Sequence, residues 1–145
     1  MNFEDVLDRC GELVYPNKGV SMLPLLREGR DLMVIAKRPK GRCKKHDAVL
    51  FKRDNGQYVL HRIVKVREQD YLLCGDNQIV REAVREKQII GVMNAVRRGN
   101  RTIHVTDWDY RLYVRVWTLL FPLRVAWFRL RGLAGKVKRR LFKNR

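Results

Sequence analysis

The chain has 145 residues, 46% of them hydrophobic and 32% charged, with a formal net charge of +17. This length and apolar content suffice for the core of one domain, which argues against a disordered chain and against a large multidomain enzyme. The three cysteines, Cys10, Cys43 and Cys74, form an odd set without a Cys-x-x-Cys spacing. That pattern argues against a disulfide framework and against a zinc site.

The positive charge is concentrated near the C-terminus. Residues 106–145 contain 11 Lys and Arg but only 2 acidic residues, a balance of +9, and residues 1–105 carry the remaining +8. We therefore expect one domain over residues 1–105, followed by a basic helical tail over residues 106–145.

An amphipathic helix packed on the domain is predicted at the N-terminus. Apolar residues recur there at helical spacing: Phe3, Val6, Leu7, Cys10, Leu13 and Val14. The segment from Met1 to Tyr15 also contains four acidic residues and no continuous apolar stretch. We therefore expect no cleavable export signal, which favours a cytoplasmic location, at the inner face of the membrane if the protein binds one.

The middle of the chain reads as a series of short strands, which predicts a mainly β domain with antiparallel pairing. Asp54-Asn55-Gly56 is a strong hairpin signal between two of these strands. The predicted strands span residues 31–36, 48–52, 58–66, 71–74, 89–96 and 102–105.

The tail reads as two helical stretches, residues 108–120 and 123–142, interrupted near Pro122. One apolar stripe is predicted on the second stretch, formed by Leu123, Trp127, Leu130, Ala134, Val137 and Leu141. The longest run without a charge in this tail, residues 116–123, is eight residues long, well short of the ~20 that a membrane span needs. Three roles remain open for residues 108–142: binding to an anionic membrane surface, docking on protein, and nucleic-acid binding, which the high apolar content disfavours.

Three short segments contain residues suited to peptide hydrolysis. Ser21 lies in Gly19-Val20-Ser21-Met22-Leu23-Pro24, His61 lies in a predicted strand, and Asp76 and Glu82 follow. A serine hydroxyl becomes a useful nucleophile when a neighbouring base takes its proton, and a carboxylate behind the imidazole stabilises the charged ring. Taken one at a time, the serine could shape a turn and the histidine could be a buried structural residue.

The surrounding sequence resembles the signal peptidase I superfamily, which includes the LexA-like self-cleaving repressors, from Gly19 to about Met93. Five blocks in the same order carry the resemblance: Ser21–Asp31, Lys44–Phe51, Leu60–Val64, Gly75–Asn77 and Ile89–Val92. The histidine at position 61 resembles the endoplasmic-reticulum, archaeal and sporulation-associated branch, whereas bacterial leader peptidases and LexA-like proteins use a lysine there.

The resemblance implies a small coiled antiparallel β domain and a serine endopeptidase in which Ser21 is the nucleophile and His61 the base. Glu82 falls where this branch has its triad aspartate, and Asp76 is the alternative third member. Gly19 replaces a family serine whose hydroxyl helps to bind the oxyanion, so any oxyanion hole depends on backbone N–H groups.

The function predicted from the sequence is removal of a leader or signal segment from a peptide or protein held in extended form, without a metal or organic cofactor. Expected partners are the leader-bearing precursor, an anionic membrane surface, and an exporter or peptide-maturation enzyme acting beside the chain. Two alternatives remain open: a catalytically weak peptide-binding or membrane-surface adaptor, and a self-cleaving regulator.

Overall fold

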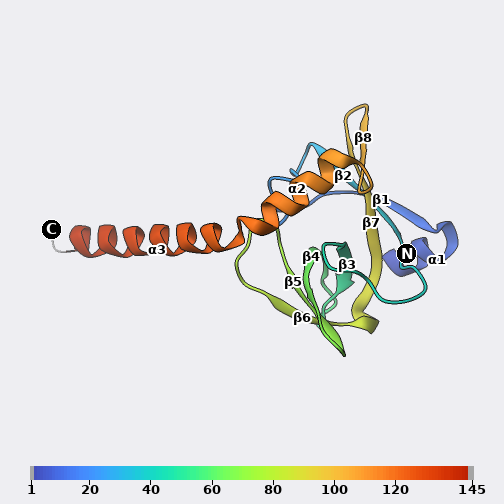
Figure 1. Ribbon diagram of the computed structural model, residues 1–145, viewed down its shortest axis with the longest axis horizontal. Helices are drawn as coiled ribbons and strands as arrows, with labels where there is room; N and C mark the ends of the chain where they lie inside the picture. The colour runs from blue at the N-terminus through green and yellow to red at the C-terminus, as the bar shows by residue number, and fades with distance from the viewer. Residues whose placement is uncertain (1, 144–145) are drawn as a thin grey trace.

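The computed structural model describes residues 2–143, with side chains described through residue 132. Eight strands form one antiparallel sheet in the order β1-β2-β7-β3-β4-β5-β6, and β8 pairs with β7 (Figure 1). The strands are β1 (Glu12–Pro16), β2 (Asp31–Lys37), β3 (Ala48–Lys52), β4 (Tyr58–Val66), β5 (Asp70–Cys74), β6 (Glu82–Arg85), β7 (Ile89–Arg98) and β8 (Arg101–His104). The helices are α1 (Phe3–Cys10), the 3₁₀ turn η1 (Glu86–Gln88), α2 (Trp108–Leu119) and α3 (Phe121–Lys143). A mainly antiparallel β fold with helices at both ends is thereby confirmed.

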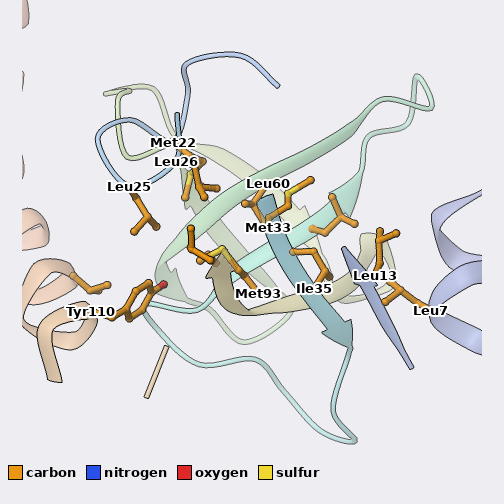
Figure 2. Close-up of a cluster of buried hydrophobic side chains, with 14 residues drawn as sticks. Leu7, Leu13, Met22, Leu25, Leu26, Met33, Ile35, Leu60, Met93 and Tyr110 are labelled. Atoms are coloured by element: carbon orange, nitrogen blue, oxygen red, sulfur yellow. The ribbon is translucent and has the colours of Figure 1, made fainter. Parts of the chain in front are cut away.

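Alternation along the strands gives the sheet two apolar faces. Leu50 and Leu60 belong to one cluster, whereas their neighbours Phe51 and His61 point to the other side of the sheet. The first cluster, shown in Figure 2, consists of Leu7, Leu13, Met22, Leu25, Leu26, Met33, Ile35, Ala48, Leu50, Leu60, Met93, Val96, Tyr110 and Val114. The second cluster consists of Cys43, Val49, Phe51, Ile63, Tyr71, Leu73, Val84 and Ile89.

The N-terminal helix is shorter than its apolar spacing predicted. Asn2 caps α1 through a reciprocal capping box with Asp5, and the helix ends at Gly11, whose φ is +73°. Leu13 and Val14, expected in the helix, lie instead in β1, where they pair with β2. The helical prediction is wrong there because the left-handed glycine ends the helix and the edge of β2 supplies backbone partners.

Six predicted strands lie within two residues of their expected bounds, but β6 was missed. This strand has only four residues, and only Val84 among them is buried. Such a short, mostly polar segment has little intrinsic strand signal, and pairing with β5 is what makes it a strand.

The two C-terminal helices follow the prediction of a break near Pro122, which lies in the first turn of α3, where a missing N–H costs little. Tyr110 and Val114 of α2 are buried in the first cluster, so α2 docks on the domain. Figure 1 shows α3 projecting away from the β domain. The predicted stripe residues Ala134, Val137 and Leu141 lie outside the residues whose side chains are described. Within residues 2–143, no helix is long and apolar enough to cross a membrane.

Candidate active site

His61 lies in the middle of β4, between β3 and β5, and its side chain is only 4% exposed. The ring packs near Phe51, with centroids 5.9 Å apart. Its Nδ1 lies 2.7 Å from Oε1 of Glu82, at the start of β6. Nδ1 makes no well-aligned hydrogen bond among the described residues, so this is a close contact in which the carboxylate lies off the N–H direction.

Arg53 holds Glu82 against the histidine. Its Nε donates to Oε2 at 3.0 Å and its Nη2 donates to Oε1 at 2.9 Å. A bidentate bond of this kind fixes both the position and the rotation of a carboxylate. The sequence interpretation did not include Arg53, although the two-residue period of the predicted hairpin places it on the same face as Phe51 and His61.

Burial and charge set the protonation states of this group. Burial lowers the pKa of His61 below its ordinary 6.5, although the Glu82 charge opposes that shift. Burial alone would raise the pKa of Glu82, but the hydrogen bonds from Arg53 and the charges of His61 and Arg53 outweigh it and lower that pKa. At neutral pH the site therefore contains a neutral imidazole facing a carboxylate, which is the resting state required of a general base with an orienting acid.

Asp76, the alternative third member, has a different partner. Its two carboxylate oxygens accept bonds from Nε and Nη2 of Arg62 at 2.8 and 2.7 Å, and both residues are 3% exposed. No ionic contact joins Asp76 to His61 among the described residues. The structure thus brings Glu82 to the imidazole and does not bring Asp76 there, because the adjacent buried guanidinium engages that carboxylate.

Ser21 lies in the turn segment that follows β1, and it is the only serine in the chain. Its backbone carbonyl accepts the N–H of Asn77 at 2.8 Å, and the Asn77 side chain donates to the carbonyl of Val20 at 3.2 Å. In the described part of the chain, no hydrogen bond joins the Ser21 hydroxyl to His61. Bonds between a nucleophile and its base are often long without substrate and shorten when substrate is bound.

Two glycines shape the backbone around Ser21. A Cβ on Gly75 would lie 2.7 Å from the carbonyl oxygen of Ser21, so only glycine allows this close approach. Gly19 has a φ of +79°, a conformation that disfavours the serine found there in the resembling family. Within the described residues the N–H of Ser21 donates no hydrogen bond.

A hollow of about 330 Å³ adjoins Ser21 and is lined by Val59 and Leu60, the two residues before His61, and by aromatic residues including Phe3 and Tyr15. β4 pairs with β3 from Tyr58 to Arg62, but with β5 only from Arg62 onward. The first half of β4 therefore has one edge without a ladder partner among the described residues, beside this hollow.

The other candidate side chains stand apart from this group. Cys74 is buried, and burial raises the pKa of its thiol, which disfavours the thiolate needed for nucleophilic attack. His46 lies in a turn with a φ of +82°, and His104 is exposed at the end of β8.

The chain matches no protein-family model and no curated protein.

Proposed function

We propose that this protein is a serine endopeptidase of the signal peptidase I superfamily, in its histidine-base branch, which removes a leader or signal segment from a peptide or protein. The observation that carries the proposal is the pairing of buried His61 with Glu82 at 2.7 Å. An imidazole with a carboxylate behind one nitrogen is the arrangement that activates a hydroxyl nucleophile.

In this mechanism Nδ1 of His61, the nitrogen close to Glu82, carries the ring proton, and Nε2 is left as the base. Ser21 Oγ attacks the scissile carbonyl carbon while its proton passes to Nε2. The C–N bond then breaks as that proton moves to the leaving amine, and water hydrolyses the ester left on Ser21 by the same route. The backbone N–H of Ser21 would stabilise the oxyanion.

The open edge of β4 and the adjoining hollow support an extended peptide as the substrate. Residues 58–61 offer backbone groups to a peptide lying along β4, and the hollow bordered by Ser21 would receive a side chain near the cut. Backbone bonds of this kind give affinity, and pockets for alternate side chains give selectivity.

The test combines leader-peptide digestion with a fluorophosphonate probe. We expect Ser21→Ala and His61→Ala each to lower turnover at least ~10³-fold while leaving the thermal unfolding transition in place. Because Ser21 is the only serine, labelling should shift one peptide in a mass spectrum. His104→Ala, at an exposed histidine, is the matched control and should keep full activity. Unchanged turnover in either active-site variant would overturn the proposal.

A second candidate is a catalytically weak peptide-binding adaptor with the same fold. The observations that favour it are the missing hydrogen bond between Ser21 and His61 and the glycine at position 19. It predicts tight binding of leader peptides by the wild type with neither cleavage nor probe labelling. The third candidate, self-cleavage, predicts a lower intact mass after incubation of the purified protein.

We further propose that α3 lies on an anionic membrane surface. Leu123, Trp127 and Leu130 are 66%, 59% and 61% exposed and follow one another at spacings of four and three residues. Arg129 and Arg131 are exposed next to this stripe. An apolar stripe flanked by arginines suits the headgroup boundary, where each cation adds about 1 kcal/mol of attraction to anionic lipid.

A further inference from the structure

The turn after β5, residues 75–77, is in contact with the nucleophile segment on one side. Asn77 donates its backbone N–H to the carbonyl of Ser21 at 2.8 Å and its side-chain amide to the carbonyl of Val20 at 3.2 Å. Gly75 lies so close to the Ser21 carbonyl that a Cβ would clash with it. The position of Ser21 is therefore set by the position of this turn.

The C-terminal helices hold the same turn from the other side. Trp117 of α2 donates its indole N–H to the backbone carbonyl of Asp76 at 2.8 Å, and Tyr113 donates its hydroxyl to Oδ2 of Asp76 at 2.9 Å. Arg124, in the first turns of α3, donates to the same carbonyl. Tyr113 and Trp117 lie one helical turn apart and stack with an interplanar angle of 16°. Both side chains on this face of α2 therefore bind the same residue, Asp76.

The Asp76 carboxylate that Tyr113 contacts belongs to a buried hydrogen-bond network. The carboxylate of Asp76 is also held by Arg62, and Arg62 donates in turn to the hydroxyl of Tyr110 at 3.2 Å. Hydrogen bonds in a buried network are stronger than in water, and each fixes the groups that it joins. α2 is itself anchored in the first cluster by Tyr110 and Val114, so the network ties the turn to the rigid core.

We propose that Tyr113 and Trp117 are positioning residues for the nucleophile, acting through Asp76 and Asn77 on the backbone of Ser21. The C-terminal helical extension is thus part of the machinery that places the serine. The consequence for catalysis rests on the proposed endopeptidase function, whereas the mechanical link from α2 to Ser21 does not. Displacing a reacting group by about 1 Å can cost roughly 100-fold in rate.

The test uses the full chain with Trp117→Phe and Tyr113→Phe, which keep an aromatic ring at each position and remove the two donors. Trp108→Phe is the matched control, since that indole is on the same helix and is 77% exposed. We expect the amide of Asn77 to exchange hydrogen at least ~10-fold faster in both variants, with the amide of Val96 in β7 unchanged as the core reference. Unchanged protection of the Asn77 amide in both variants would overturn the mechanical link from α2 to Ser21. If Trp117→Phe does not fold, the exchange rate in Tyr113→Phe is the result that tests this link.

Kinetics then test the consequence for catalysis. On a leader peptide we expect kcat to fall ~10-fold or more with KM within about twofold, because the substrate-lining residues are untouched and only the placement of Ser21 changes. Faster exchange at Asn77 with wild-type kcat would overturn the positioning role. If the wild type cleaves no leader peptide, the endopeptidase proposal fails. The hydrogen-exchange result at Asn77 still tests the link between α2 and Ser21, which does not depend on that activity.

Discussion

Oε1 of Glu82 lies 2.7 Å from Nδ1 of His61, whereas the carboxylate of Asp76 is held by the guanidinium of Arg62. Two acids that looked equivalent in the sequence therefore have different neighbours. One is placed to act on the imidazole and the other to support the fold, so their substitutions should have different effects.

Glu82→Gln should lower kcat by about 10²- to 10⁴-fold, since a neutral amide does not stabilise the imidazolium and can favour the wrong tautomer. The Glu82 charge raises the pKa of His61. In the wild type the rising limb of the kcat/KM profile should lie below pH 6.5, because the pKa of His61 is lowered. Removing the Glu82 charge should move this limb to still lower pH. The measurement is kcat/KM as a function of pH for the wild type and for Glu82→Gln.

Glu68→Gln, at an exposed acid between β4 and β5, is the control for the loss of one charge and should leave the profile unchanged. A limb that moves to higher pH in Glu82→Gln, or a wild-type limb found only in alkaline solution, would contradict this assignment.

Asp76→Asn should act on stability first. The substitution leaves the buried Arg62 guanidinium without its counter-charge, which typically costs about 3–5 kcal/mol of unfolding free energy. Asp70→Asn removes a carboxylate from a pair with Arg67 that is partly exposed, and it should cost no more than about 1 kcal/mol. Denaturant titration of both variants checks the contrast, and equal losses would be incompatible with it.

Gly75→Ala should impair catalysis more than folding. The new methyl group would meet the Ser21 carbonyl at 2.7 Å, so either that segment or the turn must move. We expect kcat to fall roughly 100-fold while the protein remains folded. Gly132→Ala, at a helical glycine with open space around it, is the control for the added methyl group itself. Wild-type kcat in Gly75→Ala would rule out the close approach as a requirement for activity.

The stability of the fold should decrease as the pH falls from 7.5 to 5.5. Burial lowers the pKa of both His61 and His46 in the folded protein. Below the unfolded value near 6.5 the unfolded chain therefore binds more protons than the folded one, and the free energy of unfolding decreases. His46→Gln with His61→Gln should flatten this slope in denaturant titrations. A wild type that gains stability over the same interval would show the opposite sign of linkage.

Membrane binding should depend on the exposed stripe of α3. Leu123→Gln with Trp127→Gln should reduce co-sedimentation with vesicles of phosphatidylglycerol and phosphatidylcholine by ~10-fold or more, since two large apolar side chains are lost. Trp108→Gln, outside this helix, should bind as the wild type does. Equal binding to vesicles of pure phosphatidylcholine would exclude an electrostatic contribution, and retained binding by the double variant would exclude this stripe.

Much of the architecture could be predicted from local pattern. Alternating apolar residues located six strands, and Asp54-Asn55-Gly56 located the hairpin that places Arg53 beside His61. The strands β1 and β6 were missed because neighbouring strands, and not their own residues, determine them. Glu82 lies at the start of β6, so the family resemblance could suggest the position of this acid, whereas the local pattern around it could not.

Residue type and strand period are local properties, and together with the family resemblance they were enough to nominate the candidate residues: one serine, a histidine on an apolar face and two acids. Only the tertiary structure, which brings distant strands and helices together, shows which acid contacts the imidazole. It also shows that α2 contacts the turn beside Ser21. A buried carboxylate must pair with whichever cation or donor the packing places next to it, and that neighbour is set by the whole chain.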